Sequence, residues 1–314
     1  MAKKIGRRDF VKKTAGLGLG FAAGGRLLYG RGGAMTPYSG ETAEVAIAKG
    51  DDIRKTVHAA VEALGGIRSF IPKGAKVALL PNVQSRHPGT YTKPEVLRGV
   101  AELCREAEAA AVDCLSWQTM KQWEDTGLAA VAAEEKVGIR TFERDESLFR
   151  AVSVPGAKSL PEARILEAFY EYDLWINMPI TKDHAGNKFT GTLKNLMGLN
   201  SPVNNRTFHR PNWKTDPDDL AHLDQCIVDL NRILKPALNV VDAVEFVVTN
   251  GPFGPGELIR PRKVLAGVDR VAVDAVCCGL WDLDPADIIM IRRGAEQGLG
   301  VMDPARIRLL EVEA

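Results

Sequence analysis

The residues best suited to chemistry are concentrated between positions 177 and 210 of this 314-residue chain. The basic residues of this segment are Lys182, Lys188, Lys194, Arg206 and Arg210. Five basic side chains stand against one carboxylate, Asp183, which leaves an excess of four positive charges. Lysine and arginine, with amide side chains beside them, bind carboxylate and phosphate groups. A solvated loop is the alternative, but so long a polar stretch inside a compact α/β domain is more often functional. The segment therefore predicts a site for a small anionic molecule.

Within this segment, three side chains are the candidate catalytic groups. His184 has an unperturbed pKa of about 6.5, near working pH, which suits a proton carrier or a metal ligand. Lys182 is the second candidate proton carrier, and Lys194 belongs with them in the polar wall of the site. Asn177 and Asn195 are the candidate ligand-binding amides. Together these residues would bind an anionic molecule and exchange a proton with it.

Two further loops follow buried strands, where the ligands of open α/β sheets bind. Asn82 lies in the first loop, which leads to a helix whose N-terminal amides are able to meet an anion. Gly251 and Gly254 lie in the second loop and would permit close backbone approach to a ligand. This loop is neither a Walker motif nor a G-x-G-x-x-G fingerprint. Ordinary turns are the alternative for both loops.

Two carboxylates, Asp269 and Asp274, stand at the start of an expected helix. Asp269 is most simply the helix N-cap, and both residues are candidates for ligand binding. The five histidines form no H-x-x-x-H or H-E-x-x-H pair, so no metal site is predicted. The five cysteines show no C-x-x-C spacing, which argues against a cysteine-ligated iron–sulfur cluster in this chain. The sequence therefore identifies no cofactor.

The elements that must position these residues alternate between strand-like and helix-like segments. Strands are expected at 44–49, 76–80, 111–115, 138–142 and 173–178, within 238–249, and at 262–266 and 306–312. Helices are expected at 51–64, after a capping box at 92–95, at 128–136, 162–170 and 216–234, and from Asp269 and Asp284. This alternation predicts an α/β fold, a mainly parallel sheet built from βαβ units with helices on both faces. Two similar sub-domains are a further arrangement that the rhythm allows.

The N-terminal segment carries a targeting signal. Arg7 and Arg8 form a pair in a basic stretch, and the apolar run 14–23 follows it. That run is shorter than the roughly 20 residues of a membrane-spanning helix, and the charges precede it, as in a twin-arginine signal. We expect residues 1–34 to be this signal, cleaved near Ala34 or retained as an anchor, and residues 35–314 to form the α/β domain. The twin-arginine translocase is then a partner, and the folded chain is periplasmic or extracytoplasmic.

Several of these motifs resemble the DUF362 family, bacterial and archaeal α/β proteins without an agreed activity. The motifs that carry the resemblance are Pro81-Asn82, Asn177–His184, Gly191–Gly198, Gly251–Gly256, Asp269–Ala275 and Gly298–Gly300. In the family's commoner form, Lys-Thr-His stands where this chain has Lys182-Asp183-His184. Some members carry an appended ferredoxin-like iron–sulfur segment, whose motif this chain lacks. The resemblance extends from about Val77 to Val301 and implies a fold and site candidates, but no reaction.

Two functions are compatible with these observations. The first is an exported protein that binds a small carboxylate or phosphate and acts on it as an enzyme. The alternative is a non-catalytic accessory subunit of a periplasmic redox or metalloenzyme complex, because export of folded proteins suits pre-assembled cargo. A redox partner protein would then be expected. The net charge of +1 gives no broad basic surface, so nucleic acid is not an expected partner.

Overall fold

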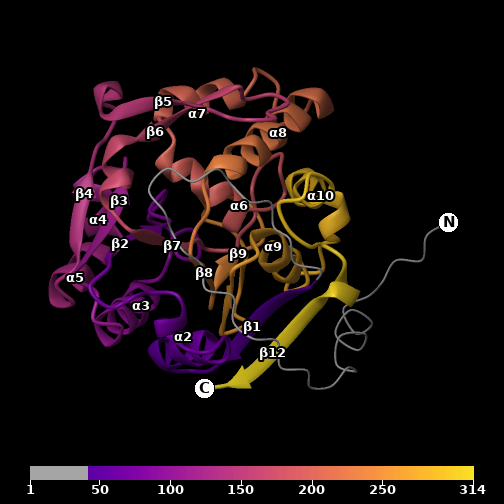
Figure 1. Ribbon diagram of the computed structural model, residues 1–314. Helices are drawn as coiled ribbons and strands as arrows, with labels where there is room; N and C mark the ends of the chain where they lie inside the picture. Colours follow the sequence, from indigo (N-terminus) through magenta and orange to yellow (C-terminus); the bar gives the residue numbers. More distant parts are fainter. Residues whose placement is uncertain (1–41) are drawn as a thin grey trace.

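The computed structural model describes residues 42–314, and the predicted export signal with Arg7 and Arg8 lies outside this range. One eight-stranded sheet takes strands from both halves of the chain, in the order β12-β1-β11-β8-β7-β2-β3-β4 (Figure 1). The strands are β1 (Ala43–Lys49), β2 (Lys76–Pro81), β3 (Ala111–Ser116), β4 (Gly138–Thr141), β7 (Leu174–Met178), β8 (Leu238–Ala243), β11 (Lys263–Gly267) and β12 (Ile307–Glu313). Within this sheet only β11 runs antiparallel to its neighbours. The predicted α/β fold with a mainly parallel sheet is confirmed.

Helices cover both faces of this sheet, as predicted. On one face lie α2 (Ile53–Glu62), α3 (Pro94–Glu106), α4 (Met120–Asp125) and α5 (Leu128–Glu134). On the other lie α6 (Thr192–Asn195), α7 (Pro202–Phe208), α8 (Pro217–Ile233), α9 (Arg270–Cys278) and α10 (Ile289–Glu296). Successive residues of β2 point to opposite faces. Val77 and Leu79 join the first apolar core, while Ala78 and Leu80 join the second. No helix within residues 42–314 has both the length and the apolar character needed to cross a membrane.

The segment 162–170 forms a strand and a short 3-10 helix, so the predicted α-helix is wrong there. β6 (Glu162–Leu166) pairs antiparallel with β5 (Phe149–Ser153), and the 3-10 segment η3 (Glu167–Glu171) follows. Ala163 and Ile165 are buried, and they alternate with Glu162 and Arg164, which are exposed. This is the period of two that a half-buried strand requires, and β5 supplies the hydrogen-bonding partner that the local sequence does not show.

Two predicted helix starts are also corrected. The N-cap of α3 is Lys93, and it makes no side-chain capping bond. Thr92 instead donates its hydroxyl to the Met178 carbonyl at 2.7 Å and accepts the Asn82 N–H at 2.9 Å, so it joins β2 to β7 and caps no helix. Asp284 caps only the 3-10 turn η5 (Pro285–Asp287), and α10 begins after that turn.

The long polar stretch after β7 contains ordered helical structure. α6 is followed directly by the 3-10 segment η4 (Leu196–Leu199) and then by α7. The remaining short strands β9 (Phe246–Val247) and β10 (Leu258–Ile259) pair with each other on either side of the Gly251 loop. A helix as short as α6 does not hold together by its own hydrogen bonds. Its position must come from packing.

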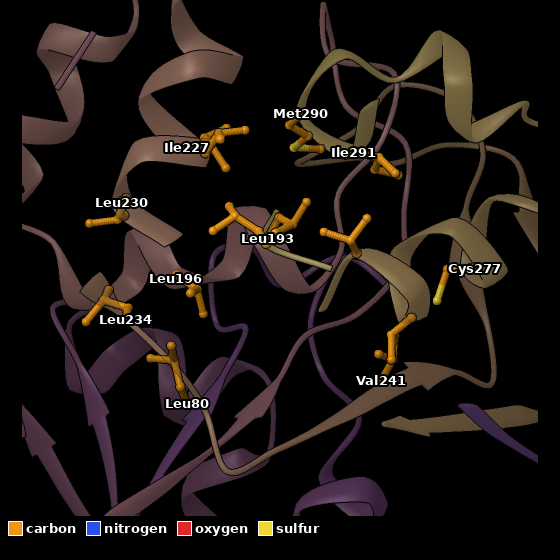
Figure 2. Close-up of a cluster of buried hydrophobic side chains, with 14 of the residues drawn as sticks. Leu80, Leu193, Leu196, Ile227, Leu230, Leu234, Val241, Cys277, Met290 and Ile291 are labelled. Carbon is orange, nitrogen blue, oxygen red and sulfur yellow. The ribbon is translucent and has the colours of Figure 1, made fainter. Parts of the chain in front are cut away.

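Figure 2 shows that packing. Leu193 of α6 and Leu196, which follows it, are fully buried and lie among side chains of the sheet, α8 and α10. Other labelled members of the same apolar core include Leu80, Val241, Ile227, Leu230, Met290 and Ile291. Each buried leucine contributes about 1.5–3 kcal/mol relative to an exposed one. These two leucines therefore fix the short helix that carries Lys194 and Asn195.

Candidate anion-binding site

A cavity of about 250 Å³ lies at the carboxyl ends of β2, β3 and β4. Side chains that follow these three strands line it on one side, and residues of α6, η4 and α7 line it on the other. This is the edge of a parallel sheet at which ligands bind. The lining residues are Leu80, Pro81, Asn82, Val83, Gln84, Ser116, Trp117, Gln118, Arg144, His184, Thr190, Lys194, Asn195, Met197, Gly198, Pro202, Asn205, Arg206 and His209.

The lining is cationic. It contains Lys194, Arg144 and Arg206, and among residues 42–314 no aspartate or glutamate lines the cavity. Two histidines, His184 and His209, add hydrogen-bonding ring nitrogens. A wall with positive side chains and no carboxylate attracts anions and disfavours cations.

Lys194 is the buried cation of this wall. Its side chain is 8% exposed, and within residues 42–314 the hydrogen-bond partner of its Nζ is the Met197 sulfur at 3.7 Å. A thioether is a weak acceptor. Burial lowers the pKa of Lys194 to about 8, and the negative charge of Asp224 opposes that shift. The ammonium is thus partly desolvated without a strong acceptor.

Asp224 does not fill that role. This buried carboxylate accepts hydrogen bonds from the Asn187 side-chain amide and from the Met290 N–H, the latter at 3.1 Å. Burial raises its pKa to about 7. No ion pair joins Asp224 to Lys194 in the described range. Its charge supports the ammonium from a distance and leaves the cavity side of Lys194 for another group.

His184 is held as a neutral ring with one free nitrogen. Its Nδ1 lies 2.6 Å from the Ala185 carbonyl, which only accepts, so Nδ1 carries the proton and donates it. Burial lowers the pKa of His184 well below 6.5, and the charge of Lys194 lowers it further. Nε2 is therefore left with a lone pair. His209 has the same arrangement, with Nδ1 3.0 Å from the Asn205 carbonyl and a pKa lowered by burial.

Four buried asparagines connect the cavity wall to the sheet. Asn82 donates to Asn195 at 3.1 Å, Asn195 donates to Asn177 at 2.8 Å, and Asn177 donates to Asn239 at 3.0 Å. Asn195 also donates to the Leu80 carbonyl at 2.9 Å. Asn177 and Asn239 are register partners on β7 and β8, so their side chains point to the same face. The chain of amides fixes the orientation of Asn82 and Asn195 at the cavity.

The start of α6 is held by a carboxylate from α9. Asp274 accepts the N–H of Thr192 at 2.6 Å and that of Leu193 at 3.0 Å. A Cβ at Gly191 would collide with the Asp274 carboxylate, so only glycine allows this close approach. Burial raises the pKa of Asp274 to about 7, while these two N–H groups favour its ionised form. Asp274 thus positions the helix that carries Lys194.

Lys182 joins two loops, the one after β2 and the Gly251 loop. Its Nζ donates to the Thr90 carbonyl at 2.6 Å, to the Pro252 carbonyl at 3.1 Å and to Asn82 Oδ1 at 3.3 Å. All three ammonium protons are used, and the side chain is fully buried. Burial lowers the pKa of Lys182 to about 7, and the nearby charge of Lys194 contributes. The contacts give Lys182 a positioning role beneath the cavity wall.

Comparison with known proteins decides the family. The family described as "Domain of unknown function (DUF362)" matches residues 77–279 of this chain. This chain belongs to the DUF362 family. The resemblance read from Asn177–His184 and the other motifs is thereby confirmed, and the family assignment itself specifies no reaction.

This DUF362 protein is 27% identical over 255 residues to a thylakoid-associated protein of Synechocystis sp.. The match covers 77% of this chain and 73% of that protein. Among solved structures, it is similar to the lactate racemase apoprotein from Thermoanaerobacterium thermosaccharolyticum, with 16% identity, a TM-score of 0.43, and coverage of 62% of this chain and 50% of that one. It is also similar to a Thermotoga maritima protein, with 14% identity, a TM-score of 0.45, and coverage of 79% and 60%. The DUF362 chain thus spans half to three-fifths of the length of these two structures.

Four of the predicted site residues of this DUF362 protein line the cavity, namely Asn82, His184, Lys194 and Asn195. Asn177 lies one layer behind them through its hydrogen bond to Asn195, and Lys182 is joined to Asn82. The sequence segment that is richest in polar residues therefore does supply much of the cavity wall.

Four other predicted residues contact the chain itself and lie outside the cavity lining. Gly251 packs against the backbone of Asp183, and Gly254 packs against Thr90. Asp269 caps α9 through the Ala272 N–H at 3.0 Å and also accepts the Val301 N–H at 2.8 Å. Asp274 holds the start of α6. Neither carboxylate is part of a metal-binding group, and no cluster of three or more potential ligands occurs within residues 42–314.

Trp117, Arg144 and His209 are lining residues that the sequence did not single out as site candidates. Trp117 follows β3 directly, and Arg144 lies three residues after β4. The rule that ligands bind at carboxyl ends of strands pointed to Trp117, but no local motif marks Arg144. His209 lies at the end of α7, and its only signal was membership of the polar segment.

Proposed function

We propose that this DUF362 protein binds a small carboxylate- or phosphate-bearing molecule in the cavity and that His184 exchanges a proton with it. The observation that carries the proposal is the state of Lys194. Its buried ammonium lines the cavity and has only the Met197 sulfur as a partner in the described range. A buried charge without a strong partner is costly, and an anionic ligand would supply the missing acceptor.

The lining supports an anion over a cation. Arg144 and Arg206 carry the same sign as Lys194, and the lining has no carboxylate that would repel the ligand. Asn82 and Asn195 are fixed by hydrogen bonds, so their polar groups lose little freedom when a ligand binds. A preorganised polar wall of this kind favours a defined ligand orientation.

His184 supports proton transfer. Its Nε2 lone pair accepts a proton from the bound molecule, and the ring then becomes an imidazolium whose Nδ1 proton still bonds to Ala185. The electron pair left on the ligand faces the ammonium of Lys194, which stabilises the negative charge. The reaction class is therefore proton abstraction from a bound anionic acid, with return of the proton completing the cycle.

The proposed place of action is outside the cytoplasm. The support is the Arg7-Arg8 pair and the short apolar run after it, which are typical of the twin-arginine route. In this proposal the translocase handles the chain after folding. The small ligand is then a molecule of the extracytoplasmic space.

Titration calorimetry with matched lysine variants tests the binding proposal. Wild type, Lys194→Met and Lys188→Met are titrated with inorganic phosphate, glycolate, malonate and succinate. Lys188 is exposed and lies outside the cavity lining. Lys188→Met therefore removes the same charge as Lys194→Met, but at a position that does not face the cavity. We expect Lys194→Met to weaken binding by at least tenfold, since a charged hydrogen bond contributes about 1.5–3 kcal/mol. We expect Lys188→Met to bind like wild type.

Equal binding by the two variants would refute the role of Lys194. A wild-type protein that binds none of these anions would instead favour the accessory-subunit alternative. Proton exchange is checked separately by following deuterium incorporation in heavy water at the carbon-bound positions of glycolate, malonate and succinate, where His184 would take the proton of a C–H bond next to the carboxylate. His184→Gln, which keeps a donor and an acceptor but cannot become a cation, should abolish incorporation and retain binding.

A further inference from the structure

The cavity has a buried cationic end and an exposed cationic end. Lys194 is buried, whereas Arg144 and Arg206 are exposed and line the same cavity. Arg144 lies in the loop after β4, and Arg206 lies in α7. The two guanidinium groups therefore mark the solvent side of the cavity, and the ammonium marks its interior.

Neither arginine has a partner within residues 42–314. Their side chains make no hydrogen bond or ion pair there, while most arginines of this range reach a carboxylate. Glu146 lies close to Arg144 in sequence but accepts the Ser201 hydroxyl, with both oxygens at 2.7 Å. A guanidinium presents paired donors that match the two oxygens of a carboxylate or phosphate. The exposed end is thus suited to a second anionic group.

The cavity lining is also partly apolar, and it holds buried donors without acceptors among residues 42–314. Trp117 and Met197 contribute apolar surface to the lining. The Trp117 indole N–H and the Thr190 hydroxyl are buried and have no hydrogen-bond partner in the described part of the chain. Unpaired buried donors are uncommon in folded proteins. They favour a ligand that is rich in oxygen acceptors over a purely apolar one.

Building on the proposed function, we infer that the ligand carries two anionic groups. Lys194 binds one group at the buried end, and Arg144 with Arg206 binds the other at the exposed end. A short body joins the groups and lies against Trp117 and Met197. Dicarboxylates and phosphorylated carboxylic acids belong to this class. A monoanion would leave one cationic end without its partner.

A matched series of acids tests this inference. Wild-type protein is titrated by calorimetry with succinate, glutarate and adipate, and with butyrate, valerate and hexanoate, the monocarboxylates of equal chain length. The same titrations are run on Arg144→Gln/Arg206→Gln and on Arg86→Gln/Arg164→Gln. Arg86 and Arg164 are exposed arginines outside the cavity lining, so the second double variant loses the same charge elsewhere.

We expect one chain length to be preferred, because the acid must be long enough to reach from Lys194 to the arginines and short enough to fit the cavity. At that length the dicarboxylate should bind wild type about tenfold or more tightly than its monocarboxylate, as expected for one added charged hydrogen-bonded group. In Arg144→Gln/Arg206→Gln the ratio of the dissociation constants of the monocarboxylate and the dicarboxylate should be near one. In Arg86→Gln/Arg164→Gln the wild-type ratio should remain. Melting curves check that each variant is folded.

Three results would overturn the inference, and they are distinguishable. If dicarboxylate and monocarboxylate bind wild type equally and Lys194→Met weakens both, the second anionic group is refuted and the proposed function stands. If neither these acids nor phosphate, glycolate and malonate bind wild type, the proposed anion site is refuted together with it. A ratio that stays high in Arg144→Gln/Arg206→Gln assigns the second anionic group to other residues and also overturns the inference.

Discussion

Asp274 accepts the backbone N–H of Thr192 at 2.6 Å, and this bond links α9 to the first residue of α6. The second carboxylate oxygen accepts the N–H of Leu193 at 3.0 Å. Lys194 and Asn195, which line the cavity, are the next two residues. The sequence suggested a ligand-binding role for Asp274, and the geometry shows a carboxylate that binds the protein's own backbone at a helix N-terminus. Its effect on any ligand must therefore pass through the position of α6.

Asp274→Asn should destabilise the fold and weaken anion binding together. The amide replaces one acceptor oxygen by a donor, which faces a backbone N–H in a fully buried place. Loss of the bond and the unpaired donors should lower the free energy of unfolding by about 1–3 kcal/mol in urea denaturation. Asp284→Asn is the matched control, because Asp284 caps the exposed turn η5 through one bond to Ala286.

For Asp284→Asn we expect a change in the free energy of unfolding below about 0.5 kcal/mol, since asparagine and aspartate cap equally well. If Asp274→Asn left both stability and anion affinity at the wild-type level, the positioning role of Asp274 would be wrong. If it lowered stability but left anion affinity unchanged, the hypothesis that Asp274 positions Lys194 for anion binding would be wrong.

Much of the fold was predictable because the central strands are short apolar runs between polar loops. β2, β3, β4 and β7 lie within a residue or two of their predicted positions. β2 and β7 are buried along almost their whole length between the two layers of helices, so their own apolar residues determine their type. The pair β5 and β6 was not predictable in this way. Each strand needs the other for its hydrogen bonds, and the apolar residues of 162–170 also fit a helical spacing.

The site was predictable where its residues lie in one dense polar segment or, as for Asn82, directly after a predicted strand. Lys194 and Asn195 were found because they lie in one dense polar motif. Arg144 reaches the cavity because β4 lies next to β3 in the sheet, and strand order is not written in the local pattern. Lys182 was expected to carry protons, since its residue type is reactive. Its real contacts come from Thr90 and Pro252, which are distant in the sequence.

Lys182→Met should loosen the two loops that Lys182 joins. Methionine has a similar length but donates no hydrogen bond, so the carbonyls of Thr90 and Pro252 lose their shared partner. We expect faster amide hydrogen exchange in residues 83–92 and 249–257, by about tenfold or more, with α8 unchanged. Exchange measured by mass spectrometry gives this comparison segment by segment.

The control for Lys182→Met is Lys188→Met, which removes a lysine from the same segment without breaking a side-chain bond among residues 42–314. Its exchange should match wild type in both loops. Unchanged exchange in the loops of Lys182→Met would show that other contacts hold them and that the role assigned to Lys182 is wrong.

The twin-arginine pair is expected to determine where the chain acts. Arg7→Lys with Arg8→Lys keeps the charge of the N-terminal segment but removes the residues that the translocase recognises. We expect the variant to accumulate in the cytoplasm, measured by cell fractionation of a bacterium that has this route. The control is Lys3→Arg with Lys4→Arg. It exchanges lysine for arginine near the Arg7-Arg8 pair, keeps the charge, and should leave export unchanged. Equal export of both variants would refute the proposed route.

Anion affinity should fall as pH rises through the alkaline range, because Lys194 loses its charge. Its pKa in the folded protein is lowered by burial from 10.5 to about 8. Below that value the ammonium is present and binding is strongest. Above it, each pH unit should weaken binding by about tenfold until the affinity of Lys194→Met is reached. Bound anion favours the ammonium, so binding near pH 8 should also take up protons, which calorimetry in buffers of different ionisation enthalpy measures.

The other groups near the cavity allow this dependence to be assigned. His184 has its pKa lowered well below 6.5 and stays neutral throughout the alkaline range. Lys182 has a pKa of about 7 and loses its charge first, but it does not line the cavity, so its effect should be the smaller one. Asp224, whose pKa burial raises to about 7, ionises in the same range, but it too lies outside the lining. Lys194→Met should therefore show a much shallower profile above pH 7.5 than wild type, whereas Lys188→Met should follow wild type. A wild-type affinity that stays constant from pH 7 to 10 would exclude the Lys194 ammonium as the anion's partner.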